Sequence, residues 1–252
     1  PAAEAWVLSC HPAGPSTVLN GKYKGKTLQE VYLADKSICG TKGKKYEFFP
    51  LLIKFIDAKR DLSIQVHPDD EYAMRVEGEY GKTEAWYILD CEPDAELILG
   101  CNRVKVKKGD VFFIESGTMH AICKGILLAE VQQNSNTTYR IYDYGRLGKD
   151  GKPRELHVDK AADVTKLCPP SIPDSSKREV EKFDNASRSK LTSCDLFTMY
   201  ELSVDGEYSS VCDEQSFVSL LCLEGSAEIE CDGEKLMMKK GESIFIPANK
   251  GK

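Results

Sequence analysis

Short strand-like runs separated by Gly and Pro turns recur along the chain. Residues 51–57 are mostly apolar, whereas residues 62–67 alternate between apolar and polar side chains. In a strand this alternation places Ser63, Gln65 and His67 on one face. Similar runs follow at residues 84–89, 96–99, 110–114 and 120–122. Closely spaced strands with such turns predict an all-β fold of the sandwich or barrel type.

A few short helices are expected among these strands. Pro68 ends the strand at residues 62–67, and the acidic pair Asp69 and Asp70 that follows resembles a capped helix start. We therefore predict a short helix that ends at about Val76.

A change of composition indicates where the chain divides. Between residues 168 and 190 it becomes rich in Pro and Ser and then in charged residues, which is typical of a loop or linker. Strand-like runs resume at residues 196–200, 217–221 and 243–247. We expect a first unit at residues 1–168, a linker at residues 169–190 and a second unit at residues 191–252.

Four side chains of metal-binding type accompany the predicted strands. Gln65 and His67 share a strand face, Glu84 opens the next strand, and His120 follows a turn at Gly117. Inward-facing side chains of a β-barrel converge on one axis, so two neutral imidazoles, a carboxylate and an amide oxygen could surround one divalent cation. Two His with one carboxylate leave positions open for water or substrate, as a catalytic metal site requires.

The second unit echoes the first. Residues 109–120 align without gaps with residues 241–252, which predicts a duplicated β unit. The polar positions differ between the copies, since Lys252 stands where the first copy has His120. A cationic side chain is a poor ligand for a cation, so we expect only the first copy to keep a metal site.

The composition is that of a globular protein. Of 252 residues, 41% are hydrophobic and 29% charged, and no apolar run approaches the ~18 residues of a membrane-spanning helix. The net charge of -6 argues against nucleic acid or an anionic membrane as a partner. The ten cysteines form no CxxC pair and no signal peptide is visible, so we expect free thiols and a cytoplasmic location.

Three segments carry a resemblance to a known family. Residues 61–69 (DLSIQVHPD), 81–87 (GKTEAWY) and 117–122 (GTMHAI) closely resemble the type I mannose-6-phosphate isomerases, and the resemblance extends over nearly the whole chain. It implies two cupin-like β-sandwich units of the short microbial form, and interconversion of mannose 6-phosphate and fructose 6-phosphate through an enediol. The family's N-terminal Trp-Gly element is absent before Pro1 and the second copy stops at Lys252, so we expect residues to be missing from both ends.

The resemblance also implies roles for individual residues. The implied zinc ligands are Gln65, His67, Glu84 and His120. The implied substrate-facing residues are Lys82, Glu130 and Arg140, with Ser63 and Asn136 also assigned to substrate binding. A carboxylate or a metal-bound water could carry the proton, and Glu130 is the leading candidate for the base. Many family members carry an acidic residue where this chain has Asn136, so if that carboxylate were essential to proton transfer, this enzyme would need another base. The partner would be a phosphosugar, bound by a monomer or a homodimer.

Two alternative functions stay open. Two His and one carboxylate also suit non-haem iron, so another metal cupin, such as an iron-dependent oxygenase, fits the same residues. A non-catalytic sugar-binding cupin would hold metal without turnover. Gln65 as a fourth ligand, with the cationic pair Lys82 and Arg140, favours the phosphosugar isomerase.

Overall fold

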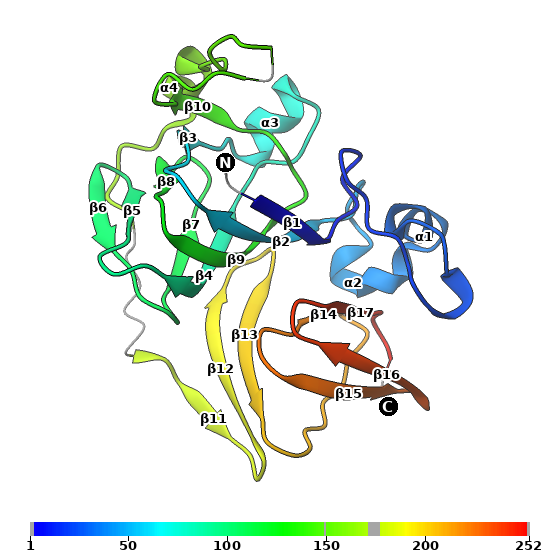
Figure 1. Ribbon diagram of the computed structural model, residues 1–252. Coiled ribbons are helices and arrows are strands. Elements are labelled where there is room, and N and C mark those ends of the chain that lie inside the picture. The colour runs from blue at the N-terminus through cyan, green and yellow to red at the C-terminus, as the bar shows by residue number, and fades with distance from the viewer. Residues whose placement is uncertain (1–2, 149, 171–176, 251–252) are drawn as a thin grey trace. The chain divides into compact units, whose positions relative to one another are not determined.

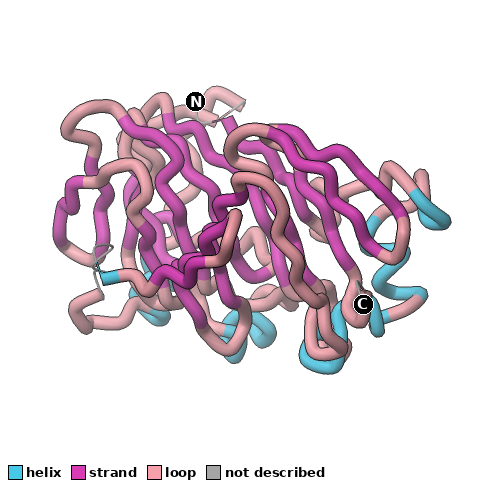
Figure 2. The backbone as a smooth tube through the Cα atoms, turned by 90° about the horizontal axis from the view of Figure 1, so that it is seen from below, coloured by secondary structure: helices cyan, strands magenta, loops and turns pink. Residues whose placement is uncertain are grey.

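Strands make up most of the regular structure in the computed structural model, which describes residues 3–148, 150–170 and 177–250 (Figure 2). The all-β fold predicted from the sequence is confirmed. Contacts divide the chain into two compact units that interleave along the sequence. Unit 1 comprises residues 1–5, 53–178 and 191–194, and unit 2 comprises residues 6–52, 179–190 and 195–252.

Two five-stranded sheets form the framework of unit 1 (Figure 1). The first contains, in spatial order, β1 (Ala3–Leu8), β2 (Leu51–Ala58), β9 (Ile126–Gln133), β4 (Glu84–Cys91) and β7 (Val111–Ile114). The second contains, in spatial order, β10 (Tyr139–Tyr142), β3 (Ile64–Val66), β8 (His120–Ile122), β5 (Glu96–Leu99) and β6 (Asn102–Lys105). The division between the units falls within β1 and β2.

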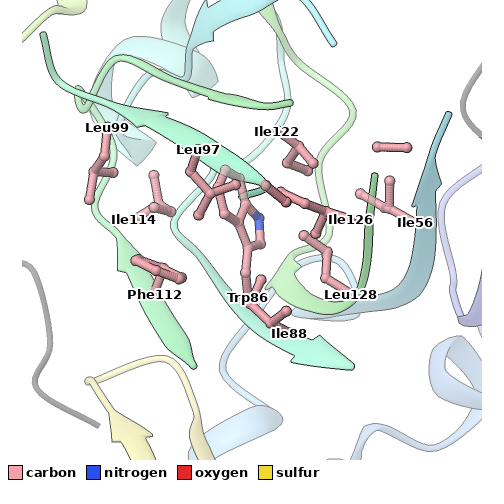
Figure 3. Close-up of a cluster of buried hydrophobic side chains, with 12 residues drawn as sticks. Ile56, Trp86, Ile88, Leu97, Leu99, Phe112, Ile114, Ile122, Ile126 and Leu128 are labelled. Carbon is pink, nitrogen blue, oxygen red and sulfur yellow. The ribbon is translucent and has the colours of Figure 1, made fainter. Parts of the chain in front are cut away.

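The core of unit 1 is built by side chains of both sheets. They surround the indole of Trp86, which has no exposed surface (Figure 3). Alternate residues of the central strands point into this core, among them Ile88, Leu97, Leu99, Ile126 and Leu128. Because strand side chains alternate with a period of two, this apolar cluster fixes which face of each strand points inward.

The inward faces become polar toward the strand ends that carry the candidate site. Lys54, Glu84 and His120 each precede, by two residues, a core residue of β2, β4 or β8. The period-two alternation therefore turns all three side chains into the interior. The packing of the apolar core thus determines where the candidate site lies.

Two helices cover part of unit 1, namely α3 (Asp70–Val76) and α4 (Val158–Val164). The predicted start of the first is confirmed, because Asp69 is its N-cap and its carboxylate accepts a hydrogen bond of 2.9 Å from Tyr72 N. The hydroxyl of Tyr72 donates to Asp163 at 2.9 Å and links the two helices.

Unit 2 combines short helices with small sheets. Its helical segments are η1 (Gly21–Tyr23), α1 (Leu28–Ala34), η2 (Lys36–Cys39) and α2 (Gly40–Gly43). Its strands pair as β11 (Val180–Lys182), β12 (Ala186–Ser193) and β13 (Thr198–Val204), as β14 (Val218–Leu221) with β17 (Ser243–Ile246), and as β15 (Ser226–Cys231) with β16 (Glu234–Lys239). The end of β12 belongs to unit 1.

An aromatic cluster explains why residues 6–52 group with the C-terminal strands. The ring of Phe49 lies 5.4 Å from that of Phe217 and 6.1 Å from that of Phe245. The predicted division into residues 1–168 and 191–252 did not anticipate the packing of Phe49 against these C-terminal rings. That division stays a prediction. In the predicted linker, residues 171–176 lie outside the described residues. The exposed strand β11 and the half-buried start of β12 form there in polar sequence without apolar alternation.

The predicted repeat is visible in the turns that precede β7 and β17. Gly109 and Gly241 both adopt left-handed backbone conformations, with φ of 88° and 87°. Each glycine N–H donates at 2.8 Å to a backbone carbonyl that precedes it in its own unit, that of Ile88 for Gly109 and that of Cys222 for Gly241. A left-handed φ favours glycine, which accounts for this residue in both copies. Lys252, which the alignment places opposite His120, lies outside the described residues.

Two observations concern the cysteines and the helices. All ten cysteines are free thiols. None of the helices in the described part of the chain combines the length and the apolarity that crossing a membrane would need.

Replacing Leu128 with Ala tests the core directly. Leu128 is fully buried, whereas its neighbour Leu127 on the same strand is 37% exposed. We expect Leu128→Ala to lower the free energy of unfolding by about 2–5 kcal/mol because it opens a cavity. The matched change Leu127→Ala should cost less than about 1 kcal/mol. Denaturant unfolding measures both, and equal losses would contradict the assigned register of β9.

Candidate metal centre

Polar side chains from both sheets meet in the interior of unit 1. Gln65 on β3 lies opposite His120 on β8, and Glu84 on β4 lies opposite Gln132 on β9. Directly opposite residues project from the same face of a sheet, so the members of each pair point the same way. His67, which follows β3, completes the group. The side chains of His67, Glu84 and His120 are at most 1% exposed.

The nitrogen and oxygen atoms of this group lie close enough to share one ion. His67 Nε2 is 3.5 Å from Glu84 Oε2, and His120 Nε2 is 3.3 Å from Glu84 Oε1. Gln65 Nε2 is 3.4 Å from His120 Nε2, while Gln65 Oε1 accepts a hydrogen bond of 3.1 Å from Ser63 Oγ. Among the described residues, His67, Glu84 and His120 are the group that could hold a metal, with ligand atoms within 4.8 Å of one another.

Backbone carbonyls fix the tautomer of both imidazoles. His67 Nδ1 lies 2.9 Å from the carbonyl oxygen of Thr137, and His120 Nδ1 lies 2.8 Å from that of Thr118. A carbonyl oxygen only accepts, so each Nδ1 carries the proton and each Nε2 keeps a lone pair. Burial holds the pKa of His67 well below 6.5 and lowers that of His120 to about 4. Both rings are therefore neutral near pH 7.

Glu84 thus faces two lone pairs with no proton between. Neither of its buried carboxylate oxygens accepts a hydrogen bond of good geometry from any residue that the structure describes, although Oε2 forms an ion pair with Lys82 Nζ at 3.1 Å. A buried carboxylate without hydrogen bonds is costly, and imidazole lone pairs beside it add repulsion. Neutral imidazoles and a carboxylate are ligands that divalent transition metals accept, so this donor set fits a metal ion.

Two lysines offset the buried negative charge. Lys82 Nζ lies 3.1 Å from Glu84 Oε2 and 3.2 Å from His67 Nε2. Lys54 Nζ lies 3.2 Å from Glu130 Oε1. Burial and the charge of Glu84 raise the pKa of the Glu130 carboxyl, although Lys54 and Lys82 oppose the shift. The ammonium groups of Lys54 and Lys82 therefore offset the negative charges of the two buried carboxylates, Glu84 and Glu130.

Glu130 is positioned by the apolar core as well as by the lysines. It lies opposite Trp86 in the pairing of β9 with β4, and Trp86 Nε1 donates a hydrogen bond of 3.1 Å to Glu130 Oε2. The other oxygen, Oε1, is buried and lies 3.8 Å from Lys82 Nζ. Glu130 is thus a desolvated carboxylate held between an indole and two ammonium groups.

Arg140 lies beside the group, on β10 opposite Gln65. Its Nη1 donates to the carbonyl of Glu155 at 3.1 Å, while its Nε is buried without a hydrogen-bond partner among the described residues. Burial, reinforced by the charge of Arg154, lowers the pKa of the Arg140 guanidinium. A cation in this position favours a negatively charged ligand.

The structure brings most of the predicted site residues together but leaves Asn136 on the surface. The four implied ligands, Lys82 and Glu130 come together, and Ser63 contacts Gln65. Asn136 is exposed, and its backbone N–H donates to Glu79 Oε2 at 3.2 Å. Lys54 was missed, although a lysine inside the apolar run at residues 51–57 is a usable signal for a paired buried charge.

The fold and the buried His–Glu–His group define a β-sandwich protein of the cupin type with a candidate metal site. Two family models match the chain: the catalytic domain of type I phosphomannose isomerase at residues 1–97, and the cupin domain of mannose-6-phosphate isomerase at residues 187–252. The mannose-6-phosphate isomerase ManA of Bacillus subtilis is 40% identical over 98% of this chain and 84% of its own length. The chain belongs to the type I phosphomannose isomerase family.

Solved structures agree with this assignment. The crystal structure of the mannose 6-phosphate isomerase of Bacillus subtilis superimposes with a TM-score of 0.90, at 39% identity over 98% of this chain and 84% of that chain. A zinc-bound structure of a mannose 6-phosphate isomerase shares the fold with a TM-score of 0.74, at 17% identity over 98% of this chain and 86% of that chain.

Binding of a divalent metal should stabilise the folded protein. At about 100 times its Kd, Zn²⁺ is expected to raise the free energy of unfolding by about 2.7 kcal/mol, because the convergent ligands exist only in the folded state. His120→Gln should abolish this increase, and His11→Gln, a histidine outside the group, should keep it. Thermal unfolding with and without Zn²⁺ measures the difference. An equal response from both variants would exclude His120 as a ligand.

Proposed function

We propose that this chain is a zinc-dependent mannose-6-phosphate isomerase, an aldose-ketose isomerase. The observation that carries the proposal is the Glu84 carboxylate between two neutral imidazoles, beside the buried carboxylate of Glu130. Membership of the phosphomannose isomerase family supports mannose 6-phosphate as the substrate. The two alternatives, an iron-dependent oxygenase and a non-catalytic sugar-binding cupin, would use the same ligands.

The proposed ligands are His67, Glu84, His120 and Gln65. The first three already point their lone pairs at one another, and a rotation of the Gln65 amide would exchange its nitrogen for its oxygen next to His120. Zinc is favoured by the nitrogen and carboxylate donors and by the zinc-bound structure that shares this fold. When bound, the ion supplies a Lewis acid for the two sugar oxygens without changing its oxidation state.

Glu130 is the proposed base. Isomerisation removes the proton from C2 of the open-chain aldose and returns a proton to C1, while the hydroxyl proton moves from O2 to O1. A carboxylate whose pKa is raised by burial is a stronger base than an exposed one and can carry the proton between the two carbons. Lys54 and Trp86 hold it in place for both transfers.

Cationic residues would stabilise the negative charge of the reacting sugar. Lys82 lies 3.8 Å from Glu130 Oε1 and is proposed to donate to the sugar oxygens where charge develops. Arg140 offers a partly buried guanidinium for the enediolate or for the phosphate. Ser63 and Asn136 are proposed as further substrate contacts. The cytoplasmic location and the choice between monomer and homodimer stay predictions.

A coupled assay for fructose 6-phosphate formation from mannose 6-phosphate tests the proposal. We expect activity that disappears on chelation, returns with Zn²⁺, and is lost in His120→Ala. A metal-loaded protein without turnover would contradict the proposal. Zn²⁺ binding without turnover would then favour a sugar-binding cupin, and oxygen consumption with Fe²⁺ would favour an oxygenase.

Replacing Glu130 with Gln tests the assignment of the base. The amide cannot accept the C2 proton, so kcat/KM should fall by about 10²–10⁴ while zinc binding persists. In the wild type, kcat/KM should fall as pH drops through the raised pKa of Glu130, because the protonated carboxyl is no base. Glu71→Gln, a change of an exposed carboxylate on α3, is the control. Full activity of Glu130→Gln would exclude Glu130 as the base.

A further inference from the structure

A short loop between β9 and β10 supplies one of the contacts that orient the metal centre. The carbonyl of Thr137 in this loop lies 2.9 Å from His67 Nδ1 and holds the proton on that nitrogen. The partner of the non-ligating ring nitrogen fixes both the tautomer and the direction of the imidazole. The position of the Thr137 peptide therefore sets the direction in which the Nε2 lone pair of His67 points.

One carboxylate binds three successive residues of this loop. Glu79 Oε2 accepts hydrogen bonds from Ser135 Oγ at 3.3 Å, Asn136 N at 3.2 Å and Thr137 Oγ1 at 3.0 Å. Glu79 is half-buried and lies just beyond the end of α3. Hydrogen bonds to a charged acceptor are roughly twice as strong as bonds between neutral groups, and these three act on consecutive residues.

The rest of the loop is held from the side of the sheet. Gln132 Nε2 donates to the carbonyls of Gln133 at 2.8 Å and Ser135 at 2.6 Å. These bonds fix the start of the loop but do not reach Asn136 or Thr137. Thr137 N also donates to Ser135 Oγ at 3.2 Å, and that hydroxyl in turn donates to Glu79, so the carboxylate of Glu79 joins the contacts that hold the loop where it turns back toward β10.

We propose that Glu79 is a positioning residue for both the metal ligands and the substrate-binding residues of the site. Through Thr137 it orients His67 toward the metal, and through the backbone N–H of Asn136 it sets the side chain expected to meet the substrate. Nothing in the sequence motifs singled out Glu79, because it acts only after the chain has folded. The inference rests on the proposed metal-dependent function but concerns how this chain builds the centre.

The test compares metal affinities, measured without sugar by competition with a chromophoric chelator. Glu79→Gln keeps the size of the side chain but removes its charge, so we expect the affinity for Zn²⁺ to fall about 10–100-fold. Glu71→Gln on α3 is the matched control and should keep the wild-type affinity. The absorption spectrum of the Co²⁺-loaded protein should also change in Glu79→Gln, because a rotated His67 alters the ligand geometry. Wild-type affinity and spectrum in Glu79→Gln would overturn the proposal.

A double-mutant cycle separates positioning from general stabilisation. Thr137→Val removes the hydroxyl that Glu79 binds and keeps the carbonyl that His67 needs. If Glu79 acts through this residue, the double variant should lose less zinc affinity than the two single losses combined. Fully additive losses would contradict the proposal. Should Glu79→Gln fail to fold, Thr137→Val and Ser135→Ala carry the test, and wild-type affinity in both would also overturn it.

These readings are distinct from a failure of the proposed function. Zinc affinity that depends on Glu79 in a protein without isomerase activity would leave the positioning role intact and contradict only the reaction. Isomerase activity together with a zinc affinity that does not depend on Glu79 would support the proposed reaction and contradict the positioning role.

Discussion

The buried carboxylate of Glu84, placed between two imidazole lone pairs, is the constraint on which the rest of the site depends. Removing a carboxylate from water costs several kcal/mol, and two neutral histidines return none of it through hydrogen bonds. Lys82 offsets the charge from one side. A divalent cation would satisfy all three ligands at once and offset this cost.

The β-sandwich makes that arrangement possible because the strand faces that build the apolar core also carry the polar residues of the site. The apolar rows that surround Trp86 fix the register, and the same rows continue into Lys54, Glu84, Glu130 and His120. Trp86 belongs to both parts, because its ring fills the core and its N–H binds Glu130. Preorganisation of the site is therefore a consequence of core packing and needs only a few additional contacts, such as those of Glu79.

Local pattern was enough to predict much of this structure. Alternation placed Ser63, Gln65 and His67 on one face, and the acidic pair at Asp69 located a helix. Residues whose role depends on distant partners were not predictable in this way. Lys54 acts through Glu130, 76 positions along the chain, and Glu79 acts through Thr137, 58 positions along the chain. Phe49 joins unit 2 through its contact with the ring of Phe217. Strands β11 and β12 were not predicted because their sequences are polar and lack apolar alternation.

X-ray absorption spectroscopy of the zinc-loaded protein tests the central claim most directly. Two neutral histidines, Glu84 and Gln65 as ligands predict a nitrogen and oxygen shell at about 2.0–2.2 Å, with outer-shell scattering from two imidazole rings. A shell dominated by sulfur at about 2.3 Å, or one without imidazole scattering, would show that the metal binds elsewhere and would contradict the account.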